Sequence, residues 1–245
     1  MPSQVWGRSP QEASDNPYEY EVQDQFVREA KALLSRLNIG LQKYSMKFHR
    51  DDHSGRKAVW MLQLDALDSL RDALDALVRK NHRVAAKLFR DVVETLDLAA
   101  FFHSETAVSN RHLAKWYNND VIPNRAYRDF VQNIEGEKAA KVKAQYYKSL
   151  SRFTHRTYRS LLKGYGLGRG DMLWHDGGHG TDLLVLPQTI AEYFSILADL
   201  IAEFSNEVIA RGLLTKKEVV QAVKSSLESD TIPRRFVQIS ALPSR

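Results

Sequence analysis

Residues 57–80 read KAVWMLQLDALDSLRDALDALVRK, a stretch in which apolar residues recur every three or four positions. This spacing places them on one face of an α-helix, and the residues concerned are Val59, Leu62, Leu67, Leu70, Leu74 and Leu77. The opposite face carries an acidic stripe made of Asp65, Asp68, Asp72 and Asp75. A helix with one apolar face needs other elements to cover that face, so the stretch predicts a helical bundle.

Apolar residues keep helical spacing on both sides of this stretch. Further helices are predicted over residues 18–48, 83–104, 110–132, 138–162, 187–212 and 215–227. Pro123 should break the helix over 110–132, because proline lacks the backbone N–H that a helix interior uses. Thr215 with Glu218 three residues later is a helix-capping pattern. Only residues 236–239 are typical of a strand, so the predicted fold class is all-α, a helical bundle of about six to seven helices.

Proline and glycine indicate how the chain is organised. Seven of its twelve glycines lie between Gly164 and Gly180, which predicts a long Gly-rich loop near 164–182. We therefore expect five regions along the chain. They are a disordered lead-in over 1–17, a helical bundle over 18–163, the loop over 164–182, a C-terminal helical pair packed on the bundle over 183–230, and a tail over 231–245.

The composition excludes several classes of protein. Hydrophobic residues make up 43% of the chain and charged residues 27%, values that are typical of a soluble globular protein. Cysteine is absent, which excludes disulfides, thiolate zinc sites and cysteine nucleophiles. No apolar run approaches the roughly 20 residues of a membrane span, and the first residues lack the apolar core of a signal peptide. We expect a cytoplasmic protein with no membrane partner.

The net charge of +5 is mild, but the basic residues are clustered. Between Lys138 and Gly170 there are nine Lys or Arg and no Asp or Glu. On a helix, one face of this segment would present Lys148, Arg152, His155, Arg156, Arg159 and Lys163. The opposite face, with Tyr147, Leu150, Thr154, Tyr158 and Leu161, would pack on the bundle. Such a basic face suits a polyanion such as RNA, and it equally suits solvent or the acidic stripe.

Two motifs carry a resemblance to a known family. Residues 88–102 read LFRDVVETLDLAAFF, and residues 147–155 read YKSLSRFTH. Together they resemble a group of bacterial helical proteins related to the HEPN superfamily, the higher-eukaryote and prokaryote nucleotide-binding fold. In that group an R-x-x-x-E pair, here Arg90 and Glu94, recurs with a later Y-x-x-L-S-x-x-x-H helix. The second motif is filled by Tyr147, Leu150, Ser151 and His155, and the resemblance covers residues 57–162.

The resemblance implies a homodimer that interacts with RNA, with no metal and no cofactor. It suggests acid or base chemistry for His155 and phosphate stabilisation by Arg152 or Arg156, with the Arg90–Glu94 pair orienting the histidine. The same pair would also suit a structural salt bridge between helices. Active ribonucleases of the superfamily separate Arg and His by four to six residues, whereas Arg152 and His155 are three apart. Two interpretations therefore stay open: a metal-independent endoribonuclease in toxin or anti-phage defence, and a non-catalytic module that binds nucleic acid or protein.

Three other segments contain residue types that bind ligands. The Gly-rich loop holds possible metal ligands, namely Asp171, His175, Asp176, His179 and Asp182, but a mobile connection explains it better. Residues 49–53, HRDDH, suit the polar end of a helix. Residues 110–119, NRHLAKWYNN, place Trp116 and Tyr117 among basic and amide residues, an arrangement that suits either single-stranded nucleic acid or a buried aromatic face.

Overall fold

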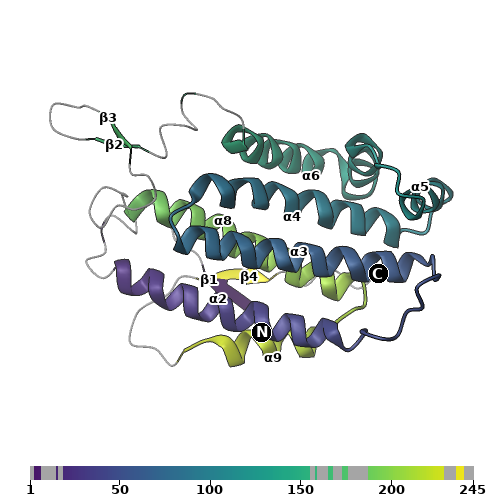
Figure 1. The fold of residues 1–245 in the computed structure, drawn as a ribbon, viewed down its shortest axis with the longest axis horizontal. Coiled ribbons are helices and arrows are strands. Elements are labelled where there is room, and N and C mark those ends of the chain that lie inside the picture. The colour runs from purple at the N-terminus through teal and green to yellow at the C-terminus, as the bar shows by residue number, and fades with distance from the viewer. Residues whose placement is uncertain are drawn as a thin grey trace.

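The computed structural model of the protein describes residues 3–6, 15, 19–154, 158, 165–167, 173–175, 187–228 and 236–239. Within this part the chain forms an all-α bundle, which confirms the predicted fold class (Figure 1). The helices are α2 (Glu19–Gln42), α3 (Gly55–Val78), α4 (His82–His103), α5 (Ala107–Tyr117), α6 (Asn124–Thr154), α8 (Pro187–Ala210) and α9 (Lys216–Ser226). Among the described residues, every helix is too short or too polar to span a membrane.

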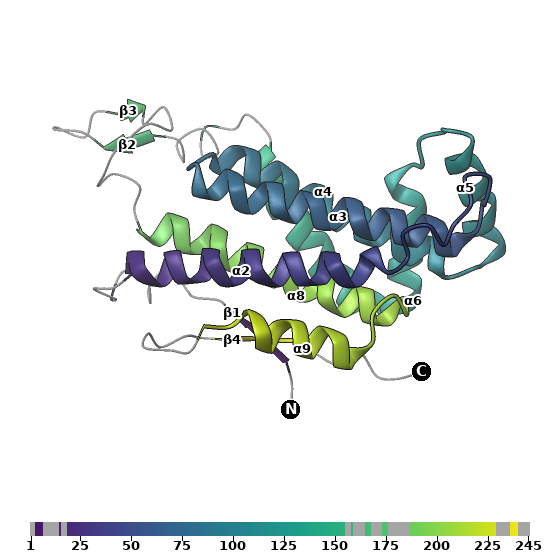
Figure 2. The same cartoon turned by 60° about the horizontal axis from the view of Figure 1, so that its bottom comes forward.

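Helix α3 lies at the centre of the bundle. It packs against α2, α4 and α8, and α4 and α8 also contact each other. Helix α6 covers the outer side of α4, and α9 covers α2 (Figure 2). Helix α5 lies at the end of the bundle where α3 begins and α4 ends. Helix α8 is therefore part of the bundle itself, and only α9 fits the expected position on its surface.

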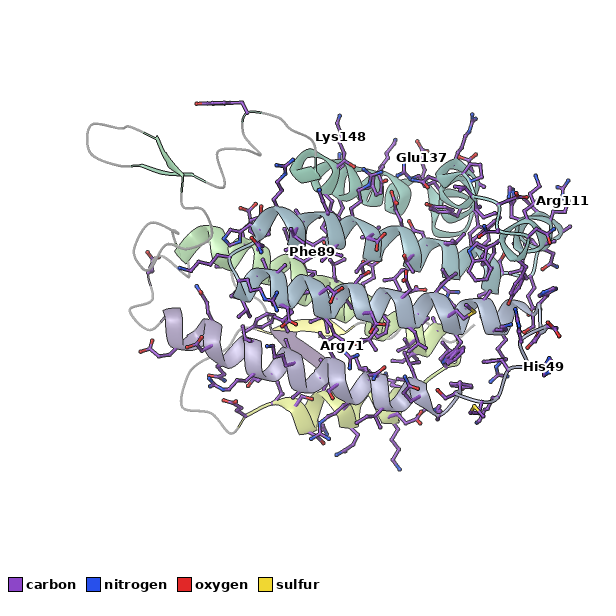
Figure 3. All side chains as sticks on the ribbon, viewed as in Figure 1. His49, Arg71, Phe89, Arg111, Glu137 and Lys148 are labelled. Atoms are coloured by element: carbon purple, nitrogen blue, oxygen red, sulfur yellow. The ribbon has the colours of Figure 1, made fainter. Side chains whose placement is uncertain are left out.

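The predicted apolar face of α3 forms the middle of the core. Its buried residues include Val59, Leu62, Leu67, Leu70, Leu74 and Leu77. Small residues are buried as well, because Ala66 and Ala73 of α3 and Ala85 and Ala99 of α4 are fully buried. Full burial of one large apolar side chain stabilises a protein by about 1.5–3 kcal/mol. Phe89 of α4, labelled in Figure 3, is fully buried, with its ring centroid 6.2 Å from that of Tyr193 of α8.

The helix ends follow local sequence signals. Thr215 accepts a hydrogen bond from the Glu218 backbone N–H (3.2 Å), and Glu218 accepts one from the Thr215 N–H (2.6 Å), which confirms the predicted capping box. Gly212 has φ 67°, a left-handed conformation that suits glycine just beyond the end of α8. Helix α2 ends at Gln42 and not at residue 48, so residues 43–54 form a connection to α3.

The predicted helix over 110–132 is divided, as Pro123 suggested, but the division begins earlier. Helix α5 ends at Tyr117, Asn119 adopts φ 67°, and α6 starts directly after Pro123. A second irregularity occurs at Gly136, whose φ of 81° and ψ of 164° are not helical. Helix α6 therefore consists of two segments joined by a kink, and the second segment carries the basic residues.

The strand pattern over residues 236–239 is confirmed, and the three other described strands lie in regions that we expected to be irregular. Strand β1 (Ser3–Trp6), within the lead-in expected to be disordered, pairs antiparallel with β4 (Phe236–Ile239), and both contact α8. Pairing satisfies backbone groups that would otherwise need water, and no local pattern reports a partner so distant in sequence. Strands β2 (Tyr165–Leu167) and β3 (Leu173–His175) form an antiparallel pair within the Gly-rich region.

The capping box of α9 gives a first prediction. Thr215→Ala should reduce the free energy of unfolding by about 1 kcal/mol, because the Glu218 N–H loses its side-chain acceptor. Urea denaturation followed by circular dichroism measures this change. Lys217→Ala in the same helical turn is the control and should stay within about 0.5 kcal/mol of the parent protein. Equal losses in the two variants would contradict a capping role for Thr215.

Candidate functional site

A cluster of polar side chains joins α4 to α6, and Glu94 is its centre. Arg90 precedes Glu94 by one helical turn, and its Nε donates a hydrogen bond of 3.0 Å to Glu94 Oε1. The two side chains are only 32% and 24% exposed. The expected ion pair is therefore present in a partly dehydrated position, where it interacts more strongly than a surface pair would.

Both segments of α6 donate hydrogen bonds to the same carboxylate. Asn124, the first residue of α6, donates from Nδ2 to Glu94 Oε1 at 3.0 Å. Tyr147, which lies beyond the kink at Gly136, donates its hydroxyl hydrogen to the same oxygen. A carboxylate accepts such bonds well because it is ionised and acceptor-only. Glu94 thus fixes both segments of α6 against α4.

The aromatic ring of Tyr147 contacts two cations. The guanidinium of Arg128 lies 3.7 Å from the ring centroid, and that of Arg90 lies 5.0 Å from it. Arg128 Nη2 is also 3.9 Å from Glu94 Oε1. Two arginines therefore share one carboxylate, and the negative face of the ring stabilises the remaining positive charge.

Tyr127 orients the amide of Asn124. Its hydroxyl donates to Asn124 Oδ1 at 2.5 Å, which leaves the Asn124 amino group to face Glu94. Burial, together with the negative charge of Glu94, raises the pKa of Tyr127 well above its usual range. The phenol therefore stays protonated, and it remains a hydrogen-bond donor.

The structure describes only part of the predicted basic face. Lys148 is exposed on the outer side of α6 (Figure 3), and Arg152 belongs to the last turn of that helix. The remaining predicted residues lie outside the described part of the chain, and these are His155, Arg156, Arg159 and Lys163.

The opposite face of the second segment of α6 behaves only partly as expected. Tyr147 and Leu150 face the bundle, and Leu150 is fully buried. Tyr158 is 71% exposed, so it does not continue the packed face.

The acidic stripe of α3 forms its described ion pairs with residues of α2 and of α3 itself, not with the basic segment of α6. Asp75 pairs with Lys31 of α2 (3.2 Å), and Asp68 lies 3.4 Å from Arg71 of the same helix. Helix α6 packs on α4, on another side of the bundle. In the described part of the chain, the stripe is therefore not the partner of the basic segment.

Sequence reasoning missed Asn124, Tyr127 and Arg128. Their only local signal is the polar run NRAYR directly after Pro123, which also suits an ordinary helix start. Their role depends on Glu94, which is 30 residues away from Asn124 on a different helix. Spacing within one helix cannot report such a contact.

The structure describes parts of the other candidate segments. His49 Nδ1 and Asp51 Oδ2 are 3.7 Å apart and highly exposed, and the described residues contain no group of three side chains able to hold a metal. The possible ligands Asp171, Asp176, His179 and Asp182 lie outside the described residues, whereas His175 belongs to β3. Trp116 packs against Phe102 with a centroid distance of 5.7 Å, which favours the buried-aromatic interpretation of that residue.

Comparison of the chain with known protein families, curated proteins and solved structures finds no match. The function is therefore inferred from the geometry of this cluster and from the resemblance of the two motifs that meet in it.

The Glu94 cluster gives a second prediction. Glu94→Gln keeps the shape of the side chain but removes its charge, so Arg90 and Arg128 lose the carboxylate that they contact in the described part of the chain. We expect a loss of about 1–2 kcal/mol in the free energy of unfolding, measured by urea denaturation. Glu137→Gln is the matched control, because Glu137 pairs with Lys141 in solvent and should contribute about 0–0.5 kcal/mol. Equal effects would contradict a special role for Glu94.

Tyr127 gives a prediction about pH. The pKa of Tyr127 is raised in the folded protein, so the unfolded chain, whose tyrosines ionise near 10, releases the proton first. The contribution of the protonated Tyr127 phenol to the free energy of unfolding is complete below pH 10 and is lost as pH rises above 10. Tyr127→Phe should therefore lose less of its free energy of unfolding than the parent protein as pH rises above 10. Urea denaturation at pH values below and above 10 measures this difference. The exposed Tyr158→Phe control should follow the parent protein, and a parent-like slope for Tyr127→Phe would contradict the prediction.

Proposed function

We propose that the protein is a HEPN-like protein that binds RNA and cleaves it without a metal ion, in a toxin or anti-phage defence role. The observation that supports this proposal is the meeting of the two resembling motifs. Arg90 and Glu94 of the first motif contact Tyr147 of the second, although 53 residues separate Glu94 from Tyr147. Such a contact is expected if the motifs belong to one site.

The proposed chemistry uses His155 and the arginines near it. A base removes the proton of an RNA 2′-hydroxyl, the oxygen attacks the adjacent phosphorus, and the bond to the 5′-oxygen breaks after that oxygen is protonated. Histidine suits the acid or base role because it titrates near neutral pH. Arg152 and Arg156 stay charged and would stabilise the extra negative charge on the phosphorus centre.

The Glu94 cluster has a positioning role in this proposal. Tyr147 precedes His155 by eight positions, and Thr154, the last residue of α6, directly precedes it. By holding both segments of α6 on α4, Glu94 fixes the helix from which the catalytic segment continues. Arg90 and Arg128 are already engaged with Glu94 and Tyr147, so they act on α6 and not on the substrate.

Electrostatics support RNA as the ligand. The second segment of α6 contains no acidic residue between Lys138 and Thr154, and Lys148 is exposed on it. Cations without neighbouring carboxylates attract the phosphate backbone and make binding sensitive to salt. The homodimer implied by the resemblance is part of the same proposal, since it would bring two such helices together.

A non-catalytic binding module is the second candidate. The spacing of three residues between Arg152 and His155 favours it, because active members of the superfamily use a longer spacing. Such a module would also use the basic segment, including Arg156, Arg159 and Lys163, to bind nucleic acid without forming a product.

Incubation with labelled RNA in EDTA tests the proposal. The wild-type protein should cleave RNA, and His155→Ala should lower the rate by about 10²-fold or more while the protein stays folded. His103→Ala, at the end of α4, is the histidine control and should cleave like the wild type. Wild-type protein that retains RNA in a salt-dependent manner but forms no product would instead support the binding module.

A further inference from the structure

A second basic region lies at the end of the bundle, around the ring of Tyr44. Tyr44 follows α2 and is largely buried. Three cations lie over its ring: Lys47 Nζ at 5.2 Å, Lys43 Nζ at 5.5 Å and the Arg56 guanidinium at 5.6 Å from the centroid. The ring itself stacks on Phe48, with 6.4 Å between centroids. Three positive groups therefore gather around one rigid aromatic support.

Their charges are only partly neutralised. Lys43 pairs with Glu218 at 2.8 Å, and this pair contributes to a pKa of about 2 for Glu218, which is therefore fully ionised near neutral pH. In the part of the chain that the structure describes, Lys47 and Arg56 have no carboxylate within ion-pair distance. Like charges held close together repel each other, and a bound anion would relieve that repulsion.

Helix stability does not explain Arg56. Arg56 and Lys57 occupy the first turn of α3, where the helix dipole disfavours positive charge. Lys57 has a structural role, because its Nζ donates to backbone carbonyl oxygens of residues 49, 50 and 52 at 3.1, 2.6 and 2.8 Å. Arg56 makes no such contact with the described residues. Arg56 is exposed and lies over the Tyr44 ring, so its guanidinium is accessible to an external ligand.

Helix α5 extends the same surface. The Tyr117 hydroxyl donates to the Ser54 carbonyl oxygen at 2.9 Å, and the ring of Tyr117 lies 4.6 Å from that of His53. These contacts hold α5 beside the connection that precedes α3. Arg111 and Lys115, one turn apart on α5, are exposed, and Figure 3 shows Arg111 at the same end of the molecule as His49.

We define the end surface by its exposed basic residues, which are Lys47, Arg50, Arg56, Arg111 and Lys115. Residues 43–57 and α5 together hold seven Lys or Arg but only two acidic residues, Asp51 and Asp52. Outside the end-surface segments and residues 138–170, the chain has more acidic than basic residues. The net positive charge of the protein is thus concentrated in two parts of the sequence, the end-surface segments and residues 138–170.

We propose that the end surface binds the phosphate backbone of single-stranded RNA, as a contact region separate from the basic segment of α6. This inference rests on the proposed function for the identity of the ligand. Its cations come from two segments that are far apart in the sequence, residues 43–57 and α5, so a flexible chain with regularly repeated charges fits them better than a compact anion does. Helix α6 starts beside α5 and leads toward Lys148, so an RNA strand bound at the end surface could continue along it (Figure 1).

The test measures binding of a long unstructured RNA, such as oligo(U), over a range of salt concentrations by fluorescence anisotropy. The double variant Lys47→Ala/Arg56→Ala should bind the RNA about tenfold more weakly at low salt. The negative slope of log affinity against log salt should become shallower by about 1.4, because two phosphate contacts are lost. Arg111→Ala/Lys115→Ala, on another helix, should have the same effect. Lys47→Arg/Arg56→Lys keeps both charges and should bind like the wild type.

The matched control is Arg36→Ala/Lys224→Ala, which removes two exposed cations from α2 and α9 and should leave the affinity unchanged. Lys148→Ala tests α6 separately. If Lys148→Ala weakens RNA binding while both end-surface alanine variants bind RNA like the wild type, this inference is overturned and the proposed function still stands. Wild-type protein that does not bind RNA would overturn both. End-surface variants that lose binding to anionic phospholipid vesicles or to an acidic peptide, with RNA binding unaffected, would overturn the RNA assignment.

Discussion

Helices α3 and α4 form the most extensive helix–helix contact in the described part of the bundle, and this packing supports the other elements of the fold. Both helices bury alanines as well as larger apolar side chains, and α2 and α8 also pack against α3. Interiors packed at this density tolerate little change in volume, so the relative position of α3 and α4 is fixed. Helix α6 is placed by α4, and α5 by the connection that precedes α3. Both basic regions of the protein are thus set by one pair of helices.

The described polar contacts that attach α6 to α4 centre on a single carboxylate. Gly136 interrupts the helix, and a kinked helix would be free to bend unless both segments were held. Glu94 holds them both, because it accepts hydrogen bonds from Asn124 before the kink and from Tyr147 after it. The polar contacts therefore give this interface a defined geometry that apolar packing alone would specify less well. Rigid placement of this kind is what the phosphodiester chemistry proposed above would require.

Local patterns in the sequence predicted the features that depend on neighbouring residues. The apolar face of α3, the capping box at Thr215 and the Arg90–Glu94 ion pair all involve positions within one or a few helical turns. Features that depend on distant residues were missed. The roles of Asn124 and Arg128 require Glu94, which belongs to another helix. The cations around Tyr44 come from the connection after α2, part of which was expected to be helical, and from the first turn of α3. The acid-free basic segment was evident from the sequence, but most of its predicted site residues lie outside the described part of the chain.

Strands β1 and β4 have a consequence for the synthesis of the protein. Ser3 pairs with Ile239, so more than two hundred residues are translated between the two partners. Contacts so far apart in sequence close late, because a large loop must be ordered before the pairing can stabilise it. On the ribosome, the helices can therefore assemble before the sheet exists. The apolar surface of α8 that the sheet contacts stays accessible to chaperones until then.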